Sequence, residues 1–350
     1  MDEIIKEDLE RIVNSNFPIE VLKNQTVLIT GATGMIGSLL IKSLLYFNIR
    51  HNTNIRIVGL ARSQERAHKV FADMLDWSNF GIIYDDVQTI SNIQEPIDYI
   101  IHGASITSSK EFVDTPVETI QTAIFGSSNL LELAKEKKVK GFVFLSSMEI
   151  YGVTDFRKTD VKEEDYGYID LLNVRSSYSE SKRMVECMCA CYAKQYGIPV
   201  KIARLCQTFG AGVEYDDNRV FAQFARCIIE KKDIILHTSG ETVRNYCYTS
   251  DAIRAILYIL IKGENGIAYN VANEETAISI RDMAEMLAKH YADSNIKVVY
   301  DIAEKQNYGY NPTIKLKLNT ERIQALGWNA TVNLMEMYDR MIKSMILKKS

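Results

Sequence analysis

The chain has 350 residues, of which 47% are hydrophobic and 25% are charged, and this size suits one large domain with a smaller lobe. A formal net charge of -4 gives no general attraction to nucleic acid or to an anionic membrane, so we expect neither partner. The acidic N-terminus is unlike a signal peptide and no apolar run of about 18 residues occurs, which favours a cytoplasmic protein.

Three of the six cysteines, Cys187, Cys189 and Cys191, lie close together in a predicted helix. Positions i, i+2 and i+4 of a helix do not converge on one metal ion, and no histidine lies near them. We therefore expect these residues to pack against other side chains, and we predict no metal site. Several free thiols also favour a reducing compartment.

Strand-like apolar runs alternate with helical patterns along most of the chain. Such alternation predicts an α/β fold with a Rossmann-type doubly wound parallel sheet, because continuous Val/Ile runs are typical of strands buried on both faces. The predicted elements are a helix over 2–14, a strand over 26–30, a helix over 35–47, a strand over 55–60, a helix over 63–75, a strand ending at 99–102, a helix over 116–137, a strand over 141–146, a helix over 178–196, a strand over 199–205 and a late strand over 269–272.

The same pattern divides the chain into three parts. We predict an N-terminal helical extension over 1–23 and an NAD(P)-binding domain over 24–205, whose sheet is completed by about 240–275. The pattern becomes less regular after residue 205, which predicts a smaller C-terminal substrate lobe formed by 206–238 and 276–350.

A glycine-rich turn, Thr30-Gly31-Ala32-Thr33-Gly34-Met35-Ile36-Gly37, joins the first strand to the first helix of the sheet. Its glycines permit a tight turn and a close approach of the backbone to a ligand. The pyrophosphate of a dinucleotide can then lie against the amides at the helix N-terminus. A tight turn without a ligand is the alternative, but the strand–turn–helix context favours a cofactor site.

The residues after the second strand bear on which dinucleotide binds. An acid at this place often accepts hydrogen bonds from the adenosine ribose, but Gly59–Ser63 contains none and instead holds Arg62. Arg62 would suit a 2′-phosphate, which leans the prediction toward NADP(H). It would also suit stacking on adenine in an NAD enzyme, or be a surface arginine, so the cofactor is predicted as NAD or NADP.

Tyr178 and Lys182 are spaced i,i+4 at the start of a predicted helix and therefore share one of its faces. A tyrosine, with an ordinary pKa of about 10, becomes a better base beside an ammonium group and a nicotinamide cation. Such a pair suits proton transfer at an alcohol during hydride transfer. The strand over 141–146 ends at Ser147 and Glu149, which a parallel sheet would deliver to the same edge.

In this order, the segments resemble the extended short-chain dehydrogenase/reductase family, also called the NAD-dependent epimerase/dehydratase family, over about residues 24–345. Within it, the sequence is most similar to UDP-glucuronate decarboxylases over Ser147–Gly152, Lys182–Glu186, Ala203–Gly210 and Asn218–Val220. The resemblance implies catalytic roles for Ser147, Glu149, Tyr178 and Lys182. It implies cofactor binding by Gly31, Thr33, Gly34, Met35, Ile36, Gly37, Arg62, Ala104, Ser105, Tyr178 and Lys182, and substrate binding by Ser147, Gln207, Arg219 and Arg244.

Four positions depart from the family patterns. Met148 replaces the serine of the decarboxylases and the aspartate that dTDP-glucose 4,6-dehydratases use as an acid, and a thioether cannot donate a proton. Ala211-Gly212 replaces the Pro-Arg of the decarboxylases, which puts recognition of a carboxylate in doubt. Ala123 replaces a common helix asparagine, and the acid after the second strand is missing at Ala61-Arg62.

The resemblance implies a nucleotide-sugar-modifying enzyme. Tyr178, Ser147 and Lys182 would oxidise a sugar hydroxyl, commonly at C4, and Glu149 would assist a decarboxylation or epimerisation before the hydride returns. The first alternative is an NADPH-dependent reductase of a nucleotide-linked keto-sugar, which needs no Glu149. The second is a non-catalytic nucleotide-binding protein, against which the intact Tyr–Lys pair argues. The family resemblance also implies a homodimer formed through the helix that carries Tyr178 and the helix over 116–137.

Overall fold

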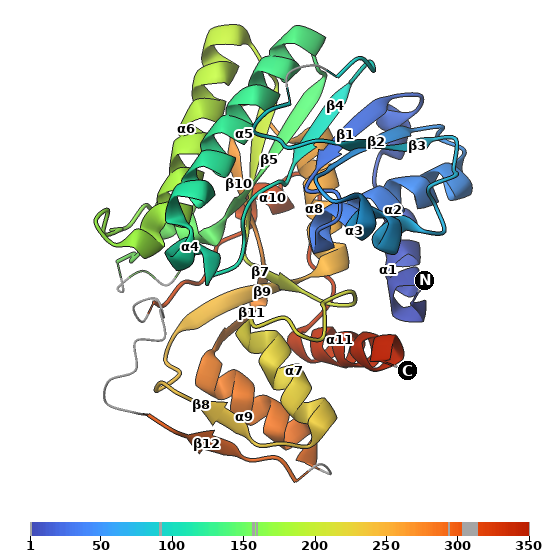
Figure 1. Cartoon of the computed structure of the whole chain (residues 1–350). Coiled ribbons are helices and arrows are strands. Elements are labelled where there is room, and N and C mark those ends of the chain that lie inside the picture. The colour runs from blue at the N-terminus through green and yellow to red at the C-terminus, as the bar shows by residue number, and fades with distance from the viewer. Residues whose placement is uncertain are drawn as a thin grey trace.

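The computed structural model describes residues 2–90, 93–155, 158, 160–292, 295–302 and 314–349. Its central element is a seven-stranded sheet in the order β10-β6-β5-β4-β1-β2-β3, whose neighbouring strands are all parallel (Figure 1). The strand order reverses beside β1, and this confirms the predicted doubly wound sheet. The strands are β1 (Thr26–Thr30), β2 (Arg56–Ala61), β3 (Phe80–Tyr84), β4 (Tyr99–His102), β5 (Gly141–Ser147), β6 (Val200–Leu205) and β10 (Ala268–Val271).

The sheet separates two hydrophobic cores because successive side chains of a strand point to opposite faces. Val27 and Ile29 of β1 pack in one core with Leu40, whereas Leu28 packs in the other with Leu130. The first core lies under α1 (Glu3–Val13), α2 (Met35–His51), α3 (Gln64–Phe71) and α8 (Thr249–Lys262), and the second under α5 (Pro116–Lys137) and α6 (Ser177–Tyr196) (Figure 1).

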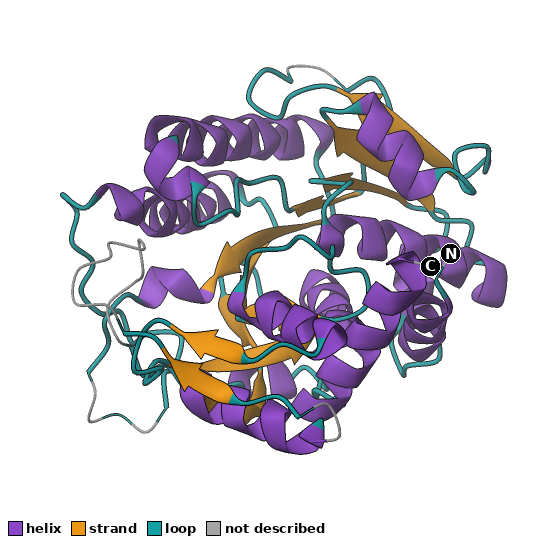
Figure 2. Ribbon diagram, turned by 60° about the horizontal axis from the view of Figure 1, so that its bottom comes forward, coloured by secondary structure: helices purple, strands orange, loops and turns teal. Residues whose placement is uncertain are grey.

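A smaller C-terminal lobe lies beyond the carboxyl ends of the main strands, at the bottom of Figure 1. It has its own hydrophobic core and a two-stranded sheet of β8 and β12, and a three-stranded sheet of β11, β9 and β7 lies between it and the main sheet (Figures 1 and 2). The elements of the lobe and of this intervening sheet are β7 (Gln207–Phe209), α7 (Val220–Glu230), β8 (Ile234–Leu236), β9 (Val243–Tyr248), β11 (Asn273–Ser279), α9 (Ile280–His290), β12 (Val298–Tyr300) and α11 (Leu334–Lys349). The short helix α10 (Glu321–Gln324) instead lies beside β10 of the main sheet (Figure 1).

The observed elements follow the predicted ones closely up to β6. The late strand is also present, as β10 beside β6. The predicted helix over 63–75 is too long, because α3 ends at Phe71 and the amides of Met74 and Trp77 bond three residues back in turns. Strand β3 and the buried helix α8 were not predicted, and β9 pairs outside the main sheet.

The N-terminal helix α1 is fastened to the C-terminal helix α11 by a buried polar cluster. The Arg340 guanidinium donates to the Asp8 carboxylate at 2.8 Å and to the Tyr248 hydroxyl at 3.0 Å. The Tyr248 hydroxyl in turn donates to Asp8 at 2.7 Å. Burial raises the pKa of the Asp8 carboxyl to about 6 in spite of these partners.

Within the described ranges, no helix combines the length and the apolar surface needed to cross a bilayer.

We predict that Arg340→Met lowers the free energy of unfolding by about 3 kcal/mol or more at pH 8, because it leaves the Asp8 carboxylate buried without its cation. The folded-state pKa of Asp8 lies above that of the unfolded chain. The loss should therefore shrink as the pH falls from 8 to about 6, because the Asp8 carboxyl of the variant becomes protonated at a higher pH than that of the parent. Urea denaturation followed by circular dichroism at pH 8 and at about pH 6 measures the free energy of unfolding of the parent and the variant.

Arg50→Met is the matched control for this prediction. Arg50 joins α2 to α1 through an ion pair with Glu10, but the side chains are 53% and 33% exposed. An exposed pair of this kind contributes less than about 1 kcal/mol. Equal losses in the two variants, or no pH dependence in Arg340→Met, would contradict the prediction.

Candidate active site

The candidate site lies where the carboxyl ends of β1, β4 and β5 meet at one edge of the sheet. Neighbouring parallel strands end at the same edge, so segments far apart in the sequence come together there. Strand β1 leads into the loop over 31–34, β4 leads into Ala104 and Ser105, and β5 ends at Ser147.

The glycine loop folds tightly between β1 and α2. Gly31 has a φ of +69°, and a Cβ added to it would lie 2.8 Å from the backbone of Gly103. A Cβ on Gly37 would overlap the carbonyl oxygen of Gly31. Gly34 is the N-cap of α2, with Met35 and Ile36 in its first turn and Thr33 just before it. The loop thus places backbone at the N-terminus of a helix, as a pyrophosphate site requires.

A buried chain of polar groups fixes the end of β4 beside this loop. The Thr30 hydroxyl lies 2.7 Å from Nδ1 of His102, and Nε2 of His102 lies 3.0 Å from the Ser127 hydroxyl. Burial and the neighbouring Lys182 charge lower the pKa of His102 to about 3, so its ring is neutral and can donate from one nitrogen and accept at the other. The amide of Ala104 donates to the Thr30 hydroxyl at 3.1 Å, which ties the segment after β4 to β1.

Lys182 reaches from α6 to the sheet. Its ammonium group is buried, donates to the carbonyl oxygen of Leu145 at 2.8 Å, and lies 4.6 Å from the centre of the Phe144 ring. Burial lowers the pKa of Lys182 to about 8, although the nearby Glu186 charge acts in the opposite direction.

Tyr178 lies one turn before Lys182, with its ring 5.7 Å from the Lys182 ammonium. Its interaction with the Ser147 side chain lowers the Tyr178 pKa, so the two residues predicted to act on the sugar oxygen are neighbours. The Tyr178 ring stacks on Phe112 of α4 (Glu111–Asp114), with centroids 4.3 Å apart and planes 10° apart. Burial and then the Glu149 charge raise the pKa of Tyr178 well above its usual range in the protein without a cofactor.

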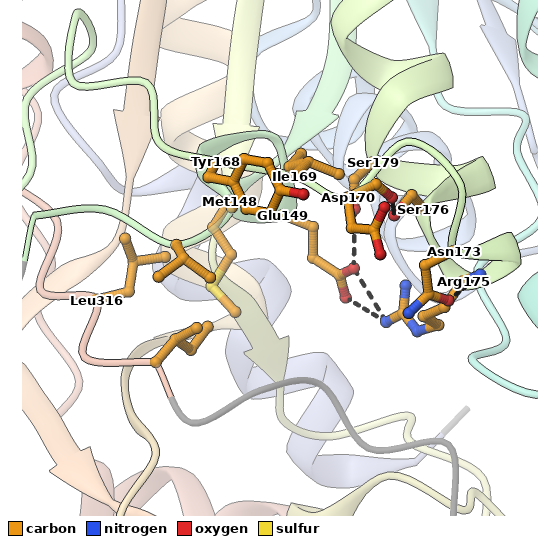
Figure 3. Close-up of a pocket in the computed structure, with 13 residues that line it drawn as sticks. Met148, Glu149, Tyr168, Ile169, Asp170, Asn173, Arg175, Ser176, Ser179 and Leu316 are labelled. Carbon is orange, nitrogen blue, oxygen red and sulfur yellow. Dashed lines mark hydrogen bonds and ion pairs between the residues drawn. The ribbon is translucent and has the colours of Figure 1, made fainter.

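Glu149 lies in the 3-10 helix η2 (Met148–Tyr151), which follows β5 directly. Its carboxylate oxygens lie 3.1 and 3.0 Å from the Arg175 guanidinium, and the Ser179 hydroxyl donates to one of them at 3.4 Å. The ion pair is largely shielded, because the side chains of Arg175 and Glu149 are 12% and 14% exposed. Figure 3 shows the carboxylate and the guanidinium facing one another across the wall of a pocket.

This pocket combines the ion pair with an apolar wall (Figure 3). Met148, next to Glu149, lines the pocket and is only 2% exposed, so a thioether that cannot donate a proton lies beside the carboxylate. The lining residues are Met148, Glu149, Gly152, Val153, Tyr168, Ile169, Asp170, Asn173, Arg175, Ser176, Ser179, Ile314 and Leu316.

The predicted substrate-binding residues Gln207, Arg219 and Arg244 are not among the residues that line this pocket. Gln207 is in β7 and Arg244 in the neighbouring β9, and the Nε of Arg244 is buried with no hydrogen-bond partner among the described residues. Arg219 precedes α7 and is already paired with Asp217 at 2.6 Å.

Arg62 follows β2, and its side chain is 69% exposed. Its guanidinium forms a long ion pair with Asp86, with 3.9 Å between the nitrogen and the oxygen.

Sequence reasoning missed two residues of the site, Arg175 and Phe112. Arg175 lies three residues before Tyr178, a local signal that could have been used, whereas nothing near Phe112 in the sequence points to the site.

Comparison with known proteins places this geometry in a family. The model of the NAD dependent epimerase/dehydratase family matches residues 27–272. UDP-glucuronic acid decarboxylase 6 of Arabidopsis thaliana is 28% identical over 315 residues, which are 89% of this chain and 86% of that protein.

Solved structures agree on the fold. UDP-glucose 4-epimerase of Thermotoga maritima with UDP-glucose is similar with a TM-score of 0.78 and 21% identity over 93% of this chain and 100% of that chain. UDP-glucuronic acid 4-epimerase of Bacillus cereus with UDP-glucuronic acid and NAD is similar with a TM-score of 0.77 and 23% identity over the same shares. These findings confirm the predicted family, fold class and enzyme character. The chain belongs to the NAD-dependent epimerase/dehydratase family.

Proposed function

We propose that this enzyme modifies a nucleotide-linked sugar without net oxidation, by oxidising a ring hydroxyl, commonly at C4, decarboxylating or epimerising the ketone and reducing it again. The observation that carries the proposal is the meeting of two groups at the end of β5. Ser147 is a neighbour of Tyr178 and lowers its pKa, and two residues later Glu149 is held in the pocket wall by Arg175. A simple oxidation or reduction requires Ser147 and Tyr178 but not Glu149.

The residues of the glycine loop fit a dinucleotide. The positive φ of Gly31 and the contact that any Cβ on Gly37 would make leave bare backbone at the N-terminus of α2, where an anionic pyrophosphate is favoured. Ala104 and Ser105 would lie along the same cofactor. When bound there, NAD would supply the hydride acceptor of the first step and the hydride donor of the last.

Tyr178 would take the proton of the sugar hydroxyl and later return it, while Ser147 orients the same oxygen. The Tyr178 pKa is high in the protein alone, so this role requires nearby positive charge. The Arg175 charge lowers the Tyr178 pKa, and Lys182, whose ammonium lies 5.7 Å from the Tyr178 ring, would hold the nicotinamide ribose.

Glu149 would act on the ketone stage, at the carbon next to the oxidised one. Its fixed position suits this, because one carboxylate is held by both an ion pair and the Ser179 hydroxyl. Met148 makes the acid-assisted chemistry of dTDP-glucose dehydratases unsuitable, and so decarboxylation or epimerisation remains the proposed middle step.

The substrate is proposed from the relatives and from one unpaired group. The similar proteins are named for UDP-linked sugars. The buried Nε of Arg244, without a partner among the described residues, would donate to a diphosphate of such a molecule. Arg219 and Gln207 would lie on the same side of the lobe as further substrate contacts.

An NADPH-dependent reductase of a nucleotide-linked keto-sugar is the second candidate. Arg62 favours it, because an exposed guanidinium only loosely paired with Asp86 is free to meet a 2′-phosphate. The two candidates differ in stoichiometry: a reductase consumes one NADPH for each product, whereas the proposed enzyme leaves its NAD unchanged.

We further propose a homodimer in the cytoplasm. Apolar side chains on the outer faces of α5 and α6 support the dimer, since Val117, Ile120, Phe125 and Met184 are between 43% and 58% exposed. All six cysteines are free thiols, and two on α6 are exposed, which supports a reducing compartment.

The proposed function is tested by incubating the purified protein with a panel of UDP- and dTDP-linked sugars and either NAD or NADPH. Products are identified by mass spectrometry and the cofactor is followed by absorbance. The proposal expects conversion of at least one sugar with no net change in cofactor. Conversion that consumes NADPH stoichiometrically would contradict it and support the reductase.

Gly37→Ala should weaken NAD binding at least about tenfold, because its Cβ would displace the Gly31 carbonyl and open the loop. Isothermal titration calorimetry measures the affinity. Gly81→Ala on β3 is the control, since a Cβ there meets no atom within 4 Å, and it should bind NAD like the parent. Equal affinities in the two variants would show that the loop does not hold the cofactor.

Tyr178→Phe should lower kcat at least about 100-fold and leave NAD affinity within a few-fold of the parent, because only proton transfer is removed. Steady-state kinetics with the best sugar of the panel measures this. Tyr196→Phe, at the far end of the same helix and 47% exposed, should leave kcat unchanged. Turnover by Tyr178→Phe within twofold of the parent would refute the assignment.

Glu149→Gln should separate the oxidation from the middle step. We expect a single turnover to accumulate NADH and keto-sugar in this variant, while product formation falls at least about 100-fold. Absorbance at the NADH band and rapid quenching of the reaction measure the two quantities. Unchanged product formation would mean that Glu149 is not needed and would favour the simple reductase.

A further inference from the structure

Arg175 is part of a continuous stack that ends on the proposed base. Its guanidinium carbon lies 4.7 Å from the centre of the Phe112 ring, and the same ring stacks on Tyr178 with centroids 4.3 Å apart. Phe112 is 2% exposed and is fastened to the start of α6 by a hydrogen bond from the Ser177 hydroxyl to its carbonyl at 3.0 Å. The stack is therefore anchored at the same turn that carries Tyr178.

The polar edge of the same guanidinium holds Glu149. Both carboxylate oxygens lie within 3.1 Å of one Arg175 nitrogen. The backbone of Arg175 is fixed as well, because its amide donates to the Asn173 side chain at 3.0 Å within the 3-10 helix η3 (Val174–Ser176). Arg175 thus touches both groups proposed to transfer protons, one directly and one through an aromatic ring.

We infer that Arg175 is a positioning residue that couples Glu149 to Tyr178 across Phe112, and that its charge balances the Glu149 charge beside the phenol. The inference rests on the proposed function, because it concerns the two groups that would act on the sugar. It adds a residue that lies in the pocket wall and that neither the sequence motifs nor the substrate contacts account for.

The opposite effects of the Glu149 and Arg175 charges can be measured as changes in the Tyr178 pKa. Glu149 raises the Tyr178 pKa, whereas Arg175 and the Ser147 side chain lower it. Lys182 lies 5.7 Å from the ring on the same helix. The remaining charged groups on the packed element α4 are Glu111 and Asp114, both exposed to solvent and therefore screened.

Removing one charge of the Arg175–Glu149 ion pair should reveal the effect of the remaining charge on the Tyr178 pKa. In Arg175→Met the Glu149 charge acts on the phenol alone, so the Tyr178 pKa rises. In Arg175→Met/Glu149→Gln both charges are absent, and the Tyr178 pKa returns toward that of the parent. Arg175→Lys keeps a charge but loses the planar stack, so its effect should lie between the two.

The test is a fluorine NMR titration of protein labelled with 3-fluorotyrosine and saturated with NAD, with the Tyr178 signal assigned by its loss in Tyr178→Phe. Fluorination lowers the phenol pKa and brings the titration toward the range in which the protein is folded. We expect Arg175→Met to move the Tyr178 midpoint upward by about 0.5 to 1 pH unit, and the double variant to reverse at least half of that shift.

Arg219→Met is the matched control, because Arg219 also lies over a phenylalanine, Phe221 at 4.7 Å, and pairs with a carboxylate, but at a distance from Tyr178 in the smaller lobe. It should leave the Tyr178 midpoint unchanged. An unchanged midpoint in Arg175→Met, or a double variant that shifts as far as Arg175→Met, would overturn the inference. Since the titration needs no sugar, this failure is distinct from an absence of turnover with the sugar panel, which would count against the proposed function alone.

Discussion

The contact between the Lys182 ammonium and the Leu145 carbonyl is the interaction on which the site depends. It joins the first turns of α6 to the last residues of β5 at 2.8 Å, in a buried environment where an unpaired ammonium would be costly. Because it fixes the helix relative to the strand, it sets Tyr178 against Ser147. The same burial lowers the Lys182 pKa to about 8, so the structure holds this charge at a cost that a bound anionic cofactor would offset.

A second polar contact, one turn further along α6, fixes the helix from behind the site. Glu186 accepts a hydrogen bond from the Ser146 hydroxyl at 2.5 Å and pairs with the buried Arg204 of β6 at 2.6 Å. The two serines at the end of β5 therefore serve different purposes. Ser146 faces the scaffold, whereas the Ser147 side chain interacts with Tyr178 and accepts a hydrogen bond from the Glu149 amide at 3.2 Å. Alternation of side chains along one strand thus separates a hydroxyl that binds the scaffold from one that meets Tyr178.

Those parts of the candidate site that depend on a few neighbouring residues could be predicted from the sequence. The glycine loop, the Tyr178–Lys182 spacing and the serine at the end of β5 are each defined by a few neighbouring residues, and the strand–helix alternation predicted that they would meet. Phe112 could not be predicted, because its contact with Tyr178 depends on how α4 packs on α6 across more than 60 residues of chain. The second half of the fold was also harder, since β7, β9 and β11 form a separate mixed sheet and α8 is apolar on nearly every side.

Met148 and Arg175 together narrow the chemistry that the pocket supports. The thioether cannot supply a proton, and the guanidinium holds the Glu149 carboxylate next to it in a fixed position. The loop over 210–212 packs on α11, with the Gly212 amide donating to Ser344 at 3.2 Å. In the proposed function, chemistry at the ketone stage therefore depends on Glu149.

The central claim is that a hydride leaves one sugar carbon and returns within the same turnover. The most direct measurement uses a nucleotide-linked sugar with deuterium at C4, converted by the enzyme with NAD, and follows the label by mass spectrometry. The account predicts that the product retains the deuterium and that NAD is unchanged at the end. Release of the label into the free cofactor pool, with one cofactor consumed for each product, would contradict it.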